Sequence, residues 1–337
     1  MLEHKYAVRR RLVYRQRHLY CSSRQTLCLF AAAFIACLAA CGGSTKPPVP
    51  VPPVPGPPVA TQHLYTPGAT GQALQFALPL KGSTPTATLS LLTASQVTAV
   101  AVDSAGNVAV GAFGGSISIF NGPITGSASS SVTFKNGTAT EVDGMAFNSA
   151  GDLFATTNSN TINVFTHPLT SASTPSQVIT SANLTNSVGI VFDSANNLIV
   201  GNSPSLAGCN LLVFTPPYTG LPIATPMVPA ALFFQTAISG TQLFVVASLP
   251  SLSRIDVYNL PITAASAPAF VINNGISGGS ASGIGAAVDS SGNLYAGLSG
   301  NTGPPDMGAI RIYAPPFSAA STPVVTNVFG TTLTIGK

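Results

Sequence analysis

Two acidic residues, Glu141 and Asp143, stand close together and outside any repeated motif of this sequence. Paired carboxylates can bind a divalent cation or exchange a proton with a substrate, so this pair is the best candidate for metal or acid–base chemistry. Arg254 and Asp306 also lie outside the repeats, and we predict one possible binding face that carries all four residues. The simpler interpretation of the pair is two solvated loop carboxylates. The sequence identifies neither a catalytic residue nor a set of metal ligands.

Other signals for catalysis fail in their context. Residues 275–279 match Gly-x-Ser-x-Gly but lie in a Gly/Ser-rich loop, whereas this motif requires a strand-to-helix elbow. After residue 40 the histidines are His63, at a turn position, and His167, before a proline, and neither suits a catalytic base. The chain has no Cys/His cluster for zinc and no phosphate-binding loop followed by Lys-Ser/Thr. The pattern favours a protein that is not an enzyme, although it leaves catalysis open.

Charge is scarce and unevenly distributed along the chain. Only 7% of the 337 residues are charged, and 7 of the 13 Lys and Arg residues precede residue 26. From Cys41 onward, six basic and eight acidic residues give a net charge of −2, which excludes a basic nucleic-acid-binding surface. A hydrophobic content of 45% is enough to bury a core. The 32 Gly and 28 Pro residues oppose a mainly helical fold.

The N-terminus has the features of an export signal. Basic residues up to Arg24 precede an apolar run over 27–40, shorter than the ~20 residues of a spanning helix. The run ends in Leu38-Ala39-Ala40-Cys41-Gly42. This ending resembles the bacterial lipobox, in which the chain is cut before a cysteine that then carries the lipid. We predict a lipoprotein signal peptide over 1–40 and lipidation at Cys41, with an uncleaved short anchor as the alternative.

A proline-rich segment follows this signal. Residues 47–58 are Pro interspersed with Val and one Gly, a composition typical of a polyproline II spacer of roughly 37 Å at ~3.1 Å per residue. We assign 41–61 to the lipidated cysteine and this linker. After cleavage and lipidation only Cys209 remains, so we expect no internal disulfide and a buried thiol. The expected location is the bacterial cell envelope, at the outer rather than the inner membrane.

A hairpin signature recurs along the rest of the chain. An apolar pair, a turn of the Asp-Ser-x-Gly-Asn type and another apolar stretch occur at 101–108, 146–153, 191–198, 237–243 (degenerate) and 287–294. The last turn position falls on residues 107, 152, 197, 242 and 293, at spacings of 45, 45, 45 and 51. Gly supplies a positive φ, and Asp accepts local backbone bonds. We therefore interpret the recurring acidic residues as structural: Asp103, Asp152, Asp193 and Asp289.

A second signature is an alternating strand that ends in an aromatic residue, with Pro three residues later. Its six copies are Phe76/Pro79, Phe120/Pro123, Phe165/Pro168, Phe214/Pro217, Tyr258/Pro261 and Tyr313/Pro316. Each repeat thus predicts four short strands: a before the turn, b after it, c ending at the aromatic, and d after the proline.

Sheets with two apolar faces must stack on neighbours, and four-stranded units of about 45 residues do so as the blades of a β-propeller. We predict an all-β fold, a six-bladed propeller over 62–337. His63 precedes Phe76 at the spacing of a strand b, so the first blade lacks its own strand a. The segment 331–337 falls where a further strand a is due, and we predict that it closes the ring by completing the first blade.

The Asp-Ser-x-Gly-Asn turns and the apolar-x-Phe/Tyr strands resemble those of NHL-repeat and SMP-30/gluconolactonase-like propellers. The resemblance implies ligands on the face of the d–a and b–c loops. Extra residues of the longer repeats fall there, around 202–209, 273–283 and 298–308. SMP-30-like lactonases hold one divalent ion through a Glu, Asn side chains and an Asp. No acidic residue lies between Glu3 and Asp103 to supply the first-blade Glu.

The first interpretation is a lipid-anchored binding or scaffold propeller of the envelope, a monomer without a cofactor. Its partner would be an envelope protein or glycan, because low charge and abundant Ser, Thr, Asn and Gly suit neutral contacts. The alternative is a metal-dependent lactonase or related hydrolase, which would use a divalent cation such as calcium. A third interpretation is a repeat protein displayed at the surface without a specific small ligand.

Overall fold

The computed structural model describes residues 61–337, with gaps at 70, 94, 158–159, 206–207, 230, 250–251, 278–281, 300–308 and 331. The predicted signal peptide, Cys41, the linker and Asp306 lie outside these residues. The described residues form strands, turns and loops. A search of them finds no helix that could span a membrane.

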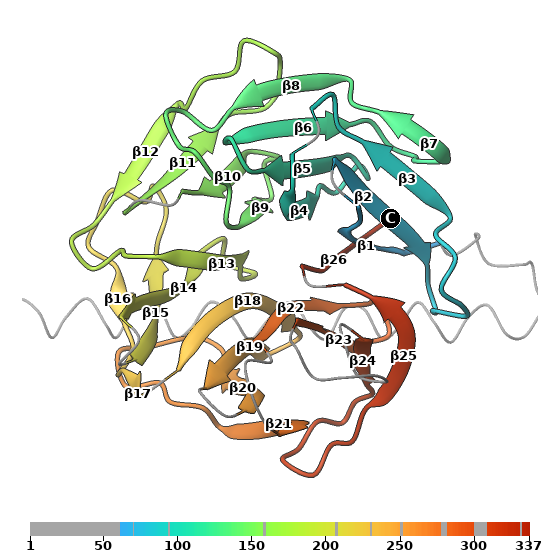
Figure 1. The fold of residues 1–337 in the computed structure, drawn as a ribbon. Helices are drawn as coiled ribbons and strands as arrows, with labels where there is room; N and C mark the ends of the chain where they lie inside the picture. The colour runs from blue at the N-terminus through green and yellow to red at the C-terminus, as the bar shows by residue number, and fades with distance from the viewer. Residues whose placement is uncertain are drawn as a thin grey trace, which may run out of the picture. The chain divides into compact units, whose positions relative to one another are not determined.

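Six sheets form a ring, each with its innermost strand toward the centre (Figure 1). Blades 1 to 3, from strand a to strand d, consist of the following strands: β26 (Thr334–Gly336), β1 (His63–Pro67), β2 (Gln72–Ala77) and β3 (Ala87–Ser90); β4 (Val97–Val102), β5 (Val108–Ala112), β6 (Ser116–Phe120) and β8 (Val132–Lys135); β9 (Met145–Phe147), β10 (Leu153–Thr156), β11 (Thr161–Phe165) and β12 (Gln177–Thr180).

Blades 4 to 6 continue the same pattern with these strands: β13 (Ser187–Phe192), β14 (Leu198–Ser205), β15 (Gly208–Phe214) and a divided strand d, β16 (Ile223–Ala224) and β17 (Val228–Pro229); β18 (Leu232–Ser239), β19 (Gln242–Leu249), β20 (Leu252–Asn259) and β21 (Phe270–Ser277); β22 (Ser282–Val288), β23 (Leu294–Ser299), β24 (Ala309–Tyr313) and β25 (Val324–Phe329). The predicted six-bladed, all-β propeller is confirmed.

The C-terminal strand closes the ring, as the sequence predicts. β26 pairs antiparallel with β1, with His63 opposite Gly336 and Tyr65 opposite Thr334, and the two strands lie side by side in Figure 1. The blade that opens the propeller is therefore completed by the last residues of the chain.

The core lies between the blades. Six clusters of buried residues each combine side chains of two neighbouring blades, and the last joins blade 6 to blade 1. The aromatic residue that ends each strand c belongs to these clusters, and Phe165 and Tyr313 are 0% exposed. Burying such a side chain stabilises the fold by about 1.5–3 kcal/mol. The aromatic residue at the end of each strand c thus packs its blade against the neighbouring blade.

The Asp-Ser-x-Gly-Asn segments form the a–b turns. Asp103 Oδ1 accepts from Ala105 N at 2.9 Å and Asn107 N at 2.8 Å, and Asp103 Oδ2 accepts from Asn107 Nδ2 at 2.8 Å. Asn107 Oδ1 accepts from Gly122 N at 3.1 Å, which ties the turn to the segment after strand c. Gly106 has a φ of +86°. The structural role predicted for these Asp residues is confirmed.

In blade 3 the same turn carries the acid and the amide in exchanged positions. Asn148 Oδ1 caps the turn, Asn148 Nδ2 donates to Asp152 Oδ2 at 3.0 Å, and Asp152 Oδ1 accepts from His167 N at 3.1 Å. Both forms of the turn contain one carboxylate and one carboxamide, so the carboxamide N–H always faces a carboxylate oxygen.

We expect Asp103→Asn alone to destabilise the protein by about 1–2 kcal/mol, because two amide groups then face each other and one donor is left without an acceptor. The exchanged pair Asp103→Asn/Asn107→Asp reproduces the blade 3 arrangement, and we expect it to lie within about 0.5 kcal/mol of the native protein. Urea denaturation of the single and double variants measures both values. A double variant as unstable as the sum of its single variants would contradict this account.

The sequence analysis did not predict three features of the fold. β7 (Gly126–Ser129), in the c–d connection of blade 2, pairs parallel with β3 as a fifth strand of blade 1. The insertions at 202–209 and 273–283 mostly lengthen strands β14, β15, β21 and β22 rather than loops. The peptide bond before each of the six repeat prolines is cis.

Candidate functional site

Glu141 and Asp143 lie on the loop face, in the connection from β8 to β9. Val142 between them is fully buried, and its carbonyl oxygen accepts from Thr98 Oγ1 at 2.6 Å. This anchor leaves the two flanking carboxyl groups half-buried and on the same side of the segment, in hydrogen-bond contact with each other. The structure therefore brings together the two acidic residues that the sequence paired.

The pair shares one proton. Burial, the charge of Glu141 and the hydrogen bond to Glu141 together raise the pKa of Asp143 to about 7, and burial is the largest of the three causes. Burial also raises the pKa of Glu141, while the hydrogen bond from Asp143 lowers it. Asp143 thus holds the proton and donates it to the Glu141 carboxylate, an arrangement that can take up or release a proton near neutral pH.

This pair makes the stability of the protein depend on pH. The pKa of Asp143 is higher in the folded state than its ordinary value of 3.8, so the folded protein binds more protons than the unfolded chain between pH ~4 and ~7. The contribution of Asp143 to folding is fully present below pH ~4 and is lost as pH rises through ~7. We expect Asp143→Asn, which keeps a donor to Glu141 without the charge, to melt higher than the native protein at pH 8 and equally at pH 4.

Melting curves from pH 4 to 9 test this expectation. Glu141→Gln is the matched control: it removes the neighbouring charge, so the midpoint of the pH-dependent loss should move to lower pH and not vanish. Parallel pH profiles for the native protein and Asp143→Asn would contradict the shared proton.

Arg254 lies in blade 5, apart from this pair, on strand β20. Its Nε lies 2.7 Å from Asp256 Oδ1, although not aligned for a hydrogen bond, and its Nη2 donates to Asp256 Oδ2 at 3.2 Å. Asp256 is 0% exposed; burial raises its pKa and the Arg254 charge lowers it. Arg254 therefore has a structural partner that the sequence analysis did not identify, although residues two apart on a strand share one face.

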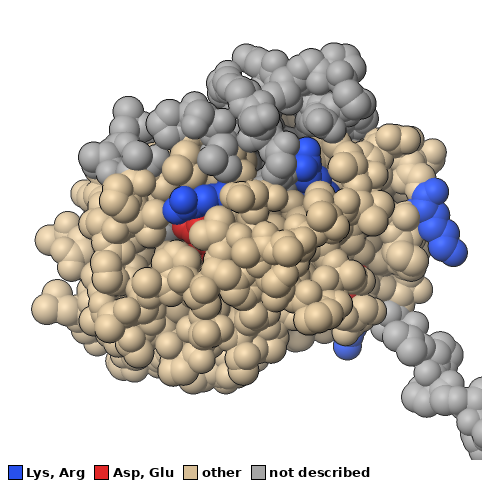
Figure 2. Space-filling view, turned by 90° about the horizontal axis from the view of Figure 1, so that it is seen from below, with Lys and Arg blue, Asp and Glu red and all other residues tan. Residues whose placement is uncertain are grey.

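A groove opens on the loop face between blades 2 and 3. Its volume is about 640 Å³, and hydroxyl and amide groups line it, including Thr138, Thr157, Thr161 and Asn163. The Asn163 amide donates to Asn136 Oδ1 at 2.9 Å, which fixes its orientation. Its lining side chains are uncharged. On the side of the molecule that Figure 2 shows, Lys, Arg, Asp and Glu are likewise few.

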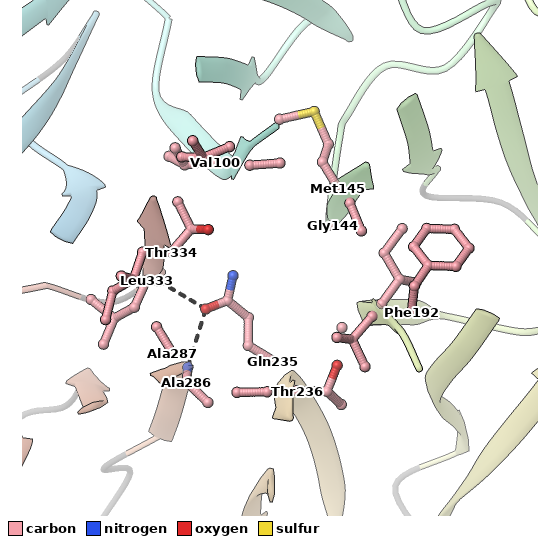
Figure 3. Close-up of a pocket in the computed structure, with 18 of the residues that line it drawn as sticks. Val100, Gly144, Met145, Phe192, Gln235, Thr236, Ala286, Ala287, Leu333 and Thr334 are labelled. Carbon is pink, nitrogen blue, oxygen red and sulfur yellow. Dashed lines mark hydrogen bonds between the residues drawn. The ribbon is translucent and has the colours of Figure 1, made fainter. Parts of the chain in front are cut away.

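A second cavity lies on the propeller axis. Its volume is about 250 Å³, and it is lined by strands a of the blades and by Leu333. Gln235 of β18 reaches into it, and its Oε1 accepts from Leu333 N at 2.8 Å and Ala286 N at 3.3 Å (Figure 3). No carboxylate is among the lining residues. Sequence reasoning missed this cavity, because its lining is formed by distant strand edges.

Comparison with known proteins supports the fold. No family model matches the chain, and none of the curated proteins does. Among solved structures, the chain is similar to a putative 6-phosphogluconolactonase from Bacteroides uniformis, with 16% identity and a TM-score of 0.58 over 81% of this chain and 84% of that chain. A protein of unknown function from Bacteroides caccae has 10% identity and a TM-score of 0.58 over 82% of this chain and 99% of that chain. A protein from Lactobacillus plantarum has 13% identity and a TM-score of 0.53 over 80% and 82%. At these identities the similarity shows the β-propeller fold, shared with a lactonase-like propeller.

Proposed function

We propose that this protein is a binding or scaffold propeller whose partner contacts the loop face. The observation that carries the proposal is the point where the chain enters the ring. Gln62 Oε1 accepts from Ser290 N in the a–b turn of blade 6 at 2.7 Å, and Leu78 N donates to the Gln62 carbonyl at 2.9 Å. Gln62, which directly precedes the first strand, therefore lies at the a–b turn face, opposite the loop face.

This placement suits a binding propeller that is attached to a membrane through its N-terminus. A lipid at Cys41 followed by a proline-rich linker would hold the a–b turn face toward an envelope membrane and leave the loop face free. The neutral, hydroxyl-lined groove between blades 2 and 3 is suited to hydrogen bonds with a glycan or with an uncharged segment of an envelope protein. We propose such a partner, a monomeric propeller and an outer-membrane location.

Co-sedimentation of the purified protein with isolated envelope fragments tests the proposal. Thr138→Arg places a large cation in the groove, and we expect it to weaken binding at least tenfold. Ser104→Arg places the same charge on an exposed a–b turn and is the matched control. Equal binding by the two variants, or no binding by the native protein, would contradict the proposal.

The Glu141–Asp143 contact favours one alternative, a metal-dependent lactonase. The residues described here do not fit its metal site well: no group of three His, Cys, Asp or Glu residues is found among them. Metal analysis and melting curves with and without EDTA distinguish the hydrolase from the binding protein. A lactone hydrolysis assay of the native protein and of Glu141→Ala then follows. A stoichiometric cation whose removal lowers the melting temperature, together with hydrolysis that Glu141→Ala abolishes, would replace the binding function with this one.

A further inference from the structure

The side chains that line the axial cavity are mostly apolar and uncharged, and backbone groups at the strand edges add polar surface. The lining side chains are Val, Ala, Ile, Leu, Met and Phe, apart from Gln235, Thr236 and Thr334, and none is charged. An ion in this cavity would have no charged side chain to pair with. At about 250 Å³, the cavity is smaller than the ~300–1,000 Å³ of drug-sized pockets. Both properties point to a small, uncharged ligand.

An irregularity in β18 directs Gln235 into this cavity. Phe233 pairs with Ala247 and Thr236 with Val245, so β18 has one residue more than β19 over this stretch. Such bulges turn a side chain out of the regular alternation and are frequent beside functional sites. β4, β13 and β22 have similar irregularities, but in the described structure the one in β18 directs a carboxamide to the axis.

Gln235 presents a donor at the centre of the cavity. Its oxygen is held by the backbone N–H groups of Leu333 and Ala286, which come from blades 1 and 6. The opposite side of the amide, Nε2, therefore points away from them and into the cavity (Figure 3). No described residue accepts a hydrogen bond from Nε2.

Thr236 supplies a second polar group. It lines the same cavity and is 8% exposed, and its Oγ1 is buried without a hydrogen-bond partner among the described residues. A buried hydroxyl without a partner costs about 1–3 kcal/mol. An acceptor oxygen in the cavity would satisfy this hydroxyl and the Gln235 amide together.

We propose that the axial cavity binds a small uncharged carboxamide, such as a primary amide or a lactam, whose oxygen accepts hydrogen bonds from Gln235 Nε2 and Thr236 Oγ1. The hydrocarbon part of the ligand packs against Val100, Met145 and Leu333. This site goes beyond the proposed function, because it takes a small molecule at the axis and not a partner in the outer groove.

Methionine-methyl NMR of the purified full-length protein with 2-piperidone, a neutral lactam, tests the proposal. Met145 lines the axial cavity, whereas Met227 lines a groove at the rim of blades 4 and 5. We expect a saturable shift of the Met145 methyl signal and an unchanged Met227 signal. Valerate, a carboxylate with the same number of carbon atoms, should leave both signals unchanged.

Thr236→Val tests the hydroxyl, and we expect about fivefold weaker binding of 2-piperidone, the effect of one hydrogen bond. Thr66→Val is the matched control, because Thr66 Oγ1 is also buried without a partner but lies on β1 and not in the cavity lining. Gln235→Leu should abolish binding, and a cooperative melt shows whether that variant folds. No Met145 shift, equal shifts with valerate, or equal weakening by the two Thr variants would overturn the proposal.

Discussion

A chain that lacks residues 332–337 should lose its cooperative unfolding transition, or melt at least ~10 °C lower than the full chain. The deletion removes β26 and with it the pairing to β1. It also removes Leu333, which is 2% exposed and joins the contact between blades 6 and 1. Loss of one buried leucine destabilises a protein by about 2–5 kcal/mol. Adding the lost strand pairing approaches the ~5–15 kcal/mol that stabilises a typical domain.

The deletion also removes contacts to other blades. Thr332 Oγ1 donates to the Thr98 carbonyl of blade 2 at 3.1 Å, and Leu333 N donates to Gln235 of blade 5 at 2.8 Å. The last residues therefore hold three blades besides their own.

Calorimetry of the two chains measures the effect. Removal of Lys337 alone, outside β26, is the control and should change the melting temperature by less than ~2 °C. Leu333→Ala, which keeps the strand, should fall between the two. A truncated chain that melts like the full chain would show that closure contributes little to stability.

The fold was predictable because interactions between residues close in the sequence specify each repeat. The Asp103 turn and its counterparts are specified by hydrogen bonds within five residues, and the aromatic at the end of strand c is required by packing between blades. Both signals are short-range, so they recur at regular spacing. The closure of the ring by the C-terminal strand could be predicted from sequence spacing, since His63 precedes Phe76 by the distance expected of a strand b, and the first blade therefore lacks a strand a of its own.

The remaining features depend on distant partners. β7 consists of Gly, Ser, Ala and Ser and has no apolar alternation; it is a strand because β3 lies beside it. Gln235 is an ordinary polar residue in the sequence and becomes a cavity group through a bulge and two strands of other blades. Asp256 could have been found, since it is two residues from Arg254 on one strand. Neither Gln235 nor β7 leaves a comparable signal in the sequence.

Arg254→Met should destabilise the protein by about 3–5 kcal/mol at pH 8, because it leaves the fully buried Asp256 carboxylate without its ion-pair partner. Methionine keeps the apolar stem of the arginine, so the loss reports mainly on the charge. Arg254 lowers the pKa of Asp256, and without it the pKa rises further above the ordinary value. The loss should therefore be smaller at pH 5, where Asp256 more readily takes up a proton, and grow as pH rises.

Denaturant titrations at pH 5 and 8 measure this difference, and Arg254→Met/Asp256→Leu is the control. The double variant removes the buried charge together with its partner, and we expect it to recover most of the lost stability. The result also decides the role of Arg254. A binding-face residue would lose envelope binding on substitution with unchanged stability, whereas the ion pair in β20 predicts that Arg254→Met weakens binding only to the extent that it unfolds the protein. If Arg254→Met has the same denaturation midpoint as the native protein, Arg254 does not stabilise the fold, and its predicted role on the binding face stands.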